Sequence, residues 1–139
     1  MPRTVESRVR VRYQETDQMK VVYHANYLVW FEIGRTDYIR ELGISYSHLE
    51  QMGILLPVLE VQCKYIQAAK YEDELKVETT VSELKGVRLT FKYQVKRVKD
   101  DQLLAEGWTQ HVFATTDLKP VNLRSKMPEL YRMIIDGIE

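Results

Sequence analysis

The chain has 139 residues, 45% hydrophobic and 29% charged, which is ordinary for one globular domain spanning residues 1–139. Its 20 basic and 20 acidic residues balance, which argues against a nucleic-acid-binding surface. The single cysteine excludes an internal disulfide, and no secretion signal or apolar run of membrane-spanning length is present, so we expect a cytoplasmic protein. The three histidines lack metal-ligand spacing, so we predict neither a metal nor a cofactor.

The first half of the chain predicts a strand, a loop and a long helix. Residues 5–14 alternate between apolar side chains and arginines, which is the period of a strand with one wet face. Residues 15–24 form a loop, and residues 26–42 follow the helical period. The apolar stripe of this helix consists of Tyr27, Trp30, Phe31, Gly34, Tyr38 and Leu42. Gly34 in that stripe predicts a close approach to another backbone, and Gly43 ends the helix.

The second half predicts a meander of strands and a terminal helix. A short helix over 46–52 is followed by strands over 58–69, 74–84, 87–98 and 102–117. The final segment, MPELYRMIIDGI, is an amphipathic helix with Leu130, Met133, Ile134 and Gly137 on one face. These elements favour an α+β fold in two layers, with a five-stranded antiparallel sheet, one long helix and a C-terminal helix. The polar far face of the sheet would be wet or would form a subunit interface.

The joint between the first strand and the long helix combines an acid with an anion-binding element. A helix N-terminus has free N–H groups and a positive dipole end, so it can stabilise the oxygen of a carbonyl under attack. Residues 24–27 lie at that end, and Asp17 precedes His24 by seven residues. Asp17 could therefore act on the same carbonyl as a nucleophile or as a base for water.

Structural explanations exist for each of these residues. Asp17 is also a common turn former, and a histidine such as His24 is often a surface residue. Asn26 is a good N-cap, Tyr27 fits core packing, and Tyr23 suits either packing or a pocket wall.

The segment ETDQMKVVYHANYLVWFEIGR resembles the signature of hotdog-fold acyl-CoA thioesterases of the 4-hydroxybenzoyl-CoA thioesterase type. Small bacterial thioesterases associated with the Tol-Pal region share this pattern. The likeness continues through LPVLEVQCKYIQAAKYEDELKVET, residues 56–79, and so extends over most of the chain.

The resemblance implies a hotdog fold, in which the sheet wraps around the long helix, and hydrolysis of acyl-CoA to a free acid and CoA. Asp17 would be the nucleophile or general base, the backbone N–H near His24 would hold the thioester oxygen, and the His24 imidazole would orient the site. The residues expected to contact substrate are Tyr23, Asn26, Tyr27, Lys85 and Arg88, the last two near the CoA phosphates. Members of this family are homodimers or homotetramers with active sites at the subunit interface.

Two other functions stay open, and one residue departs from the family pattern. The chain could be a non-catalytic hotdog module that binds acyl-CoA or a partner protein, because a fold does not determine a function. It could also dehydrate an acyl thioester, although the acid would then be expected beside the histidine on the helix. Lys20 stands where the family commonly has Gly, so we expect an altered loop or a positive charge near Asp17.

Overall fold

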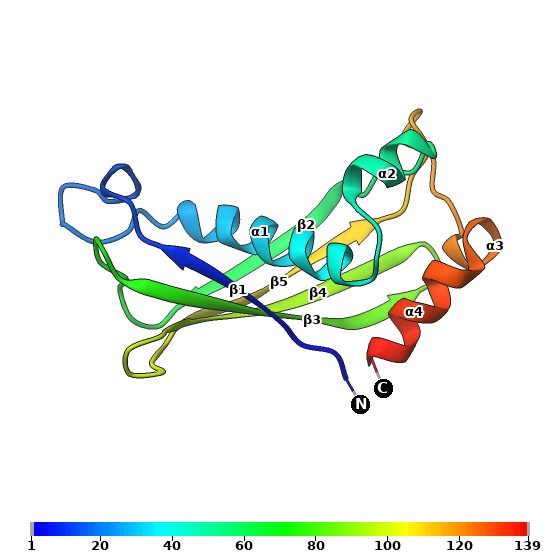
Figure 1. Cartoon of the computed structure of the whole chain (residues 1–139). Coiled ribbons are helices and arrows are strands. Elements are labelled where there is room, and N and C mark those ends of the chain that lie inside the picture. Colours follow the sequence, from blue (N-terminus) through cyan, green and yellow to red (C-terminus); the bar gives the residue numbers. More distant parts are fainter. Residues whose placement is uncertain (1, 139) are drawn as a thin grey trace.

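The structure, a computed structural model that describes residues 2–138, consists of an antiparallel sheet with one long helix across one face (Figure 1). The strands are β1 (Val5–Arg10), β2 (Val58–Tyr65), β3 (Glu74–Lys85), β4 (Arg88–Arg97) and β5 (Leu103–Val112). They are ordered β1-β3-β4-β5-β2, and every neighbouring pair is antiparallel. The predicted fold class, a five-stranded sheet with one long helix and a C-terminal helix, is confirmed.

The long helix begins and ends close to its predicted bounds. The helices are α1 (Asn26–Glu41), α2 (Tyr46–Gln51), α3 (Leu123–Lys126) and α4 (Pro128–Ile138), with a 3₁₀ turn, η1 (Tyr13–Glu15). The short α3 was not predicted, and the side chain of Asn122 caps it by accepting from the Ser125 N–H. In the described chain no helix combines the length and the apolar character needed to cross a membrane.

Three predicted strands are too long, because local hydrogen bonds end them early. The first strand ends at Arg10, since η1 turns the chain and leaves Tyr13 74% exposed instead of on the buried face. β2 ends at Tyr65, where the N–H groups of Ile66 and Gln67 both bond to the Leu104 carbonyl. The fifth strand ends at Val112 rather than at residue 117.

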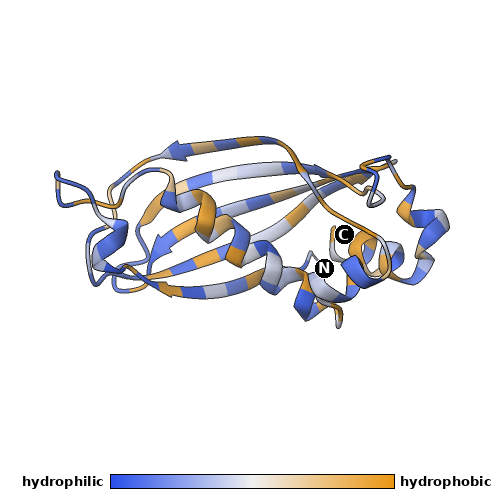
Figure 2. Ribbon diagram, turned by 90° about the horizontal axis from the view of Figure 1, so that it is seen from above, coloured by the Kyte–Doolittle hydropathy of each residue, from blue (hydrophilic) through white to orange (hydrophobic). Residues whose placement is uncertain are grey.

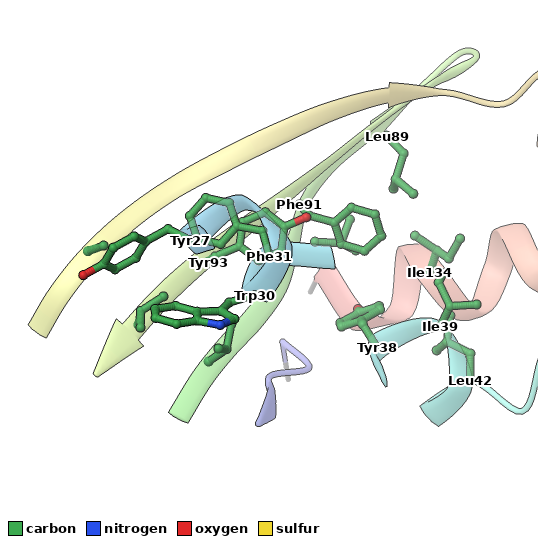
Figure 3. Close-up of a cluster of buried hydrophobic side chains, with 14 of the residues drawn as sticks. Tyr27, Trp30, Phe31, Tyr38, Ile39, Leu42, Leu89, Phe91, Tyr93 and Ile134 are labelled. Carbon is green, nitrogen blue, oxygen red and sulfur yellow. The ribbon is translucent and has the colours of Figure 1, made fainter. Parts of the chain in front are cut away.

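The core lies between α1 and the sheet. All six residues of the predicted apolar stripe are buried, and the aromatic members point onto the inner face of the sheet (Figure 3). Phe31 stacks on Tyr93 of β4 with ring centroids 4.3 Å apart. Gly34 approaches the side chains of Thr79 and Val77 on β3, and the predicted contact with another backbone is therefore wrong.

The terminal helix closes the end of the core that lies farthest from the start of α1. Ile134 is fully buried and lies beside Ile39 and Leu42 (Figure 3). Leu130 and Gly137 are also buried, whereas Met133 is 38% exposed, so its predicted place on the buried face is wrong.

The opposite face of the sheet is polar. Hydrophilic and hydrophobic residues alternate along the strands (Figure 2). Ion pairs cross this outer face, with Lys76 to Asp101 at 2.7 Å and Lys96 to Glu78 at 2.7 Å. The outer face is therefore suited to contact with water, which is one of the two arrangements expected for it; the other was a subunit interface.

Gly107 allows β2 to lie against β5. It pairs with Cys63, and a Cβ built on Gly107 would collide with the Gln62 carbonyl oxygen and crowd the Cys63 Cα. Both obstacles are backbone atoms, which cannot rotate away. A residue without a side chain is therefore required for this strand pairing.

His111 sits in a buried hydrogen-bonded chain on the inner face of the sheet. Its Nε2 lies 2.8 Å from Thr109 Oγ1, which lies 2.6 Å from the Tyr93 hydroxyl, and its Nδ1 lies 3.2 Å from the Leu56 carbonyl. The imidazole is fully buried, and this desolvation lowers the pKa of His111 to about 4.

This histidine predicts a loss of stability in mild acid. An unfolded histidine binds its proton near pH 6.5, whereas the native one does so only near pH 4, so protons favour the unfolded chain between these values. We expect the free energy of unfolding to fall by roughly 2 kcal/mol from pH 6.5 to pH 4.5 through this residue alone. Urea denaturation of wild type and His111→Gln across this range measures it, and parallel curves for the two proteins would contradict it.

Candidate active site

The loop that carries Asp17 is a tight hairpin. The Tyr23 N–H donates to the Glu15 carbonyl at 2.8 Å, and the Asp17 N–H donates to the Val21 carbonyl at 3.0 Å. Thr16 and Val22 form an isolated bridge between these bonds. Asp17 is thus held by backbone pairing on both sides and does not lie in an open loop.

Lys20 adopts a left-handed backbone conformation that a glycine would adopt without strain. Its φ is +66°, in the left-handed region, and its N–H donates to the Asp17 carbonyl at 2.9 Å. A residue with a Cβ costs roughly 1–2 kcal/mol in this region, so the hairpin keeps its shape at the expense of strain. Within residues 2–138 no ion pair joins Lys20 to Asp17.

Asp17 is a partly buried residue, and its carboxylate makes one contact with the hairpin at an exposed position. Its Oδ1 accepts from the Met19 N–H at 2.8 Å, as the structural explanation of this residue requires. Its Oδ2 accepts no hydrogen bond from the part of the chain that the structure describes. One carboxylate oxygen therefore fixes the turn while the other remains able to attack a carbonyl or to accept a proton from water.

The start of α1 presents free N–H groups. Ala25 occupies the N-cap position and has no capping side chain, so the prediction of Asn26 as N-cap is wrong. Asn26 is the first helical residue, and its Nδ2 donates to the Glu15 carbonyl at 2.9 Å. The N–H groups of His24 and Ala25 have no acceptor among residues 2–138. Such a helix start can bind a negatively charged oxygen.

A cavity of about 230 Å³ adjoins this helix start. It is lined by Val21, Val22, His24, Tyr27, Tyr65, Ile66, Gln67 and Ala68. The Tyr65 hydroxyl donates to the His24 carbonyl at 3.1 Å and so ties the helix start to the end of β2. Partial burial raises the pKa of Tyr65 to about 12, so this phenol stays a protonated donor well into the alkaline range.

The structure gathers four of the predicted residues around this cavity. His24 and Tyr27 line it, Asn26 begins the helix beside it, and the half-exposed ring of Tyr23 lies 4.5 Å from the His24 ring. Asp17 lies in the adjoining hairpin but does not line the cavity.

The two predicted basic residues lie elsewhere in the protomer. Lys85 ends β3 and Arg88 begins β4, at the end of the sheet away from the Asp17 hairpin (Figure 1). The 12 residues of β3 separate the two ends by about 36 Å. One protomer therefore does not bring Lys85 or Arg88 to the helix start.

Two residues that organise the site were not predicted. Tyr65 holds the His24 carbonyl, and the Glu15 side chain is buried at 4% exposure between the hairpin and α1. The burial of Glu15 was not indicated by the alternation of β1, because the η1 turn breaks that period and leaves Tyr13 exposed between Val11 and Glu15. No local signal marks Tyr65 either, since its role depends on the approach of a strand 41 residues away from His24.

Known proteins share both the sequence pattern and the fold. Residues 11–131 match the family model described as the thioesterase-like superfamily. The acyl-CoA thioesterase YbgC of Haemophilus influenzae is 43% identical over 64% of this chain and 66% of its own length. The YneP protein of Bacillus subtilis is 35% identical over 87% of this chain and 88% of its own.

A solved structure extends the likeness to nearly the whole fold. The DHNA-CoA thioesterase of Staphylococcus aureus superposes with a TM-score of 0.89 at 34% sequence identity. The superposition covers 96% of this chain and 91% of that one. A hotdog thioesterase fold, expected from the sequence motif, is therefore confirmed.

Proposed function

Because this chain belongs to the thioesterase-like superfamily, we propose that it is an acyl-CoA thioesterase that uses water and no cofactor. The observation that carries this proposal is a pair of N–H groups at the start of α1 that find no acceptor within residues 2–138. Beside them is a hairpin whose Asp17 Oδ2 accepts no hydrogen bond from the same residues. This arrangement combines an oxyanion-binding element with a nucleophile or base.

In the proposed reaction the thioester oxygen accepts hydrogen bonds from the His24 and Ala25 N–H groups. Asp17 then attacks the carbonyl carbon and releases CoA as its thiolate, or it removes a proton from the water that attacks. An anhydride formed by the first route would be hydrolysed by water to regenerate the carboxylate. The N–H groups contribute roughly 3–4 kcal/mol each for a well-placed donor, because charge on the oxygen develops in the transition state.

A binding module is the second candidate, and the turn-forming contact of the Asp17 carboxylate favours it. The two functions differ in one measurement, the release of free thiol from a panel of acyl-CoAs that includes short aliphatic and aryl groups. Thiol release with turnover supports the enzyme. Acyl-CoA binding without thiol release supports the module, and dehydration would appear only with a 3-hydroxyacyl thioester.

We also propose that a second copy completes the site. β2 is an edge strand, and four of its exposed residues are apolar or aromatic: Val58, Leu59, Val61 and Tyr65. An uncovered edge of this kind favours association with another strand. Antiparallel pairing of two β2 strands would form a homodimer, and two such dimers could form a homotetramer.

In such a dimer, Lys85 and Arg88 of one subunit would lie near the substrate bound by the other. A twofold axis between two β2 strands reverses the second sheet, so its β3–β4 turn lies at the same end as the first Asp17 hairpin. Tyr65 ties the start of α1 to the end of β2, so with strands about 4.8 Å apart the partner's β3–β4 turn would lie three to four strand widths from that helix start. Lys85 of the partner subunit could then approach the CoA phosphates.

The half-buried Cys63 on β2 fits our expectation of a reducing cytoplasm.

A charge introduced on the β2 edge is expected to dissociate the proposed dimer and to lower the thioesterase activity. Val61 is 43% exposed on this strand, and Val61→Lys would place two like charges near the proposed axis. We expect a monomer by light scattering and at least about a tenfold loss of kcat/KM, because the site loses a wall that orients substrate. Gln94→Lys adds the same charge to the outer face of β4 and should change neither property. A Val61→Lys variant that remains dimeric would contradict the proposed interface.

A further inference from the structure

We infer that Glu15 is a positioning residue, whose buried carboxylate fixes the Asp17 hairpin against the first turns of α1. This inference rests on the proposed function, since it concerns the distance between Asp17 and the N–H groups that bind the thioester oxygen. Glu15 itself is 4% exposed and does not line the cavity.

Both carboxylate oxygens of Glu15 accept hydrogen bonds. Oε1 accepts from the Arg12 N–H at 2.8 Å, and Oε2 accepts from the indole Nε1 of Trp30 at 3.1 Å. The Arg12 guanidinium lies 3.5 Å from Oε1 and supplies the opposite charge. A buried carboxylate is tolerated only with such partners, so its place in the fold is closely specified.

The backbone of Glu15 is held as firmly as its side chain. Its carbonyl accepts from the Tyr23 N–H at 2.8 Å and from the Asn26 Nδ2 at 2.9 Å. Asn26 and Trp30 are four residues apart, so they extend from the same face of α1. Helix α1 therefore forms two hydrogen bonds to Glu15, one to its backbone carbonyl and one to its carboxylate.

This double attachment sets the geometry of the proposed site. Asp17 is only two residues beyond Glu15, and the free N–H groups of His24 and Ala25 directly precede Asn26. Removing one attachment would let the hairpin shift relative to the helix start. A displacement of about 1 Å can lower a rate by about 10²-fold, because the reacting groups lose their alignment.

Kinetics of two Glu15 variants test this role. Glu15→Gln keeps the volume but offers one acceptor oxygen to two N–H donors, so we expect kcat to fall about tenfold. Glu15→Ala removes both contacts, and we expect a fall of about 10²-fold. KM should stay within about threefold in both, because Glu15 does not touch the cavity. An unchanged kcat, or a change confined to KM, would overturn the inference.

Three further variants separate positioning from general destabilisation. Trp30→Phe removes the indole N–H that Oε2 of Glu15 accepts, at a residue that does not line the cavity, and it should also lower kcat about tenfold. This variant decides the question if the Glu15 variants do not fold. Ile134→Ala destabilises the far end of the core, and Glu6→Gln changes an exposed acid of β1. Both should keep the kcat of wild type under conditions where they are folded. A kcat for Ile134→Ala as low as that of Glu15→Gln would overturn the inference.

A proton NMR signal tests the contact without any activity. The chain has two tryptophans, and the indole N–H of Trp30 should shift upfield in Glu15→Ala while that of Trp108 stays in place. If wild type releases no thiol but this shift occurs, the proposed function fails while the Glu15 contact stands. If wild type is active and the indole signal does not move, the inference about Glu15 fails.

Discussion

Asp17→Asn is expected to lower kcat for a short acyl-CoA by at least about 10²-fold, since an amide is neither a useful nucleophile nor a base. The variant is nearly isosteric, and its amide oxygen can still accept from the Met19 N–H. The hairpin should therefore keep its shape, and KM should change little. Thiol release under substrate saturation measures this effect.

The control for this variant is an acid of similar character away from the helix start. Asp37 lies on α1 and pairs with Arg40 at 3.0 Å on the surface, so Asp37→Asn should retain wild-type kcat. Circular dichroism at the assay temperature establishes that both variants are folded. A folded Asp17→Asn protein with wild-type turnover would show that this carboxylate is not the reacting group.

Phe31→Ala is expected to cost the fold about 3–5 kcal/mol. Phe31 is fully buried at the centre of α1 and stacks on Tyr93 at 4.3 Å, so its removal leaves a cavity between the helix and the sheet. The same change would loosen the face of α1 that carries Trp30, one residue before it. We therefore expect a loss of stability first and, in the fraction that stays folded, a lower kcat.

Urea denaturation at one fixed protomer concentration measures the stability change, because association would otherwise alter the midpoint. Phe31→Leu keeps most of the buried volume and should cost less than Phe31→Ala. Met52 is 43% exposed, and Met52→Ala should change the free energy of unfolding by no more than about 0.5 kcal/mol. Equal midpoints for Phe31→Ala and Met52→Ala would mean that α1 does not pack on the sheet through this ring.

Elements with a regular hydrophobic period could be predicted from the sequence. β3 and β4 bury alternate residues, and α1 buries the whole predicted stripe, because packing on a single core imposes these periods. Strand ends were less predictable. Tyr13 continues the alternation of β1 but is exposed, since the η1 turn depends on hydrogen bonds that periodicity does not reveal.

The candidate site could be predicted only in part, because several of its hydrogen bonds join segments that are distant in the sequence. Periodicity located a loop over 15–24 and the helix start, and the family resemblance pointed to Asp17 and His24 within them, whereas spacing alone left turn formation and surface roles open. The amide of Asn26 bonds to Glu15, 11 residues earlier, instead of capping its own helix. Such a contact follows from the tertiary approach of two segments, and no local propensity encodes it.

Gly107 also limits which amino-acid substitutions the fold tolerates. β2 can lie against β5 only while position 107 lacks a side chain, and the same strand carries Tyr65 to the carbonyl of His24. An added methyl group would therefore displace the strand that supports the candidate site, although position 107 lines no part of the cavity beside His24. A single hydrogen atom at position 107 therefore determines whether the edge strand can reach the helix start at all.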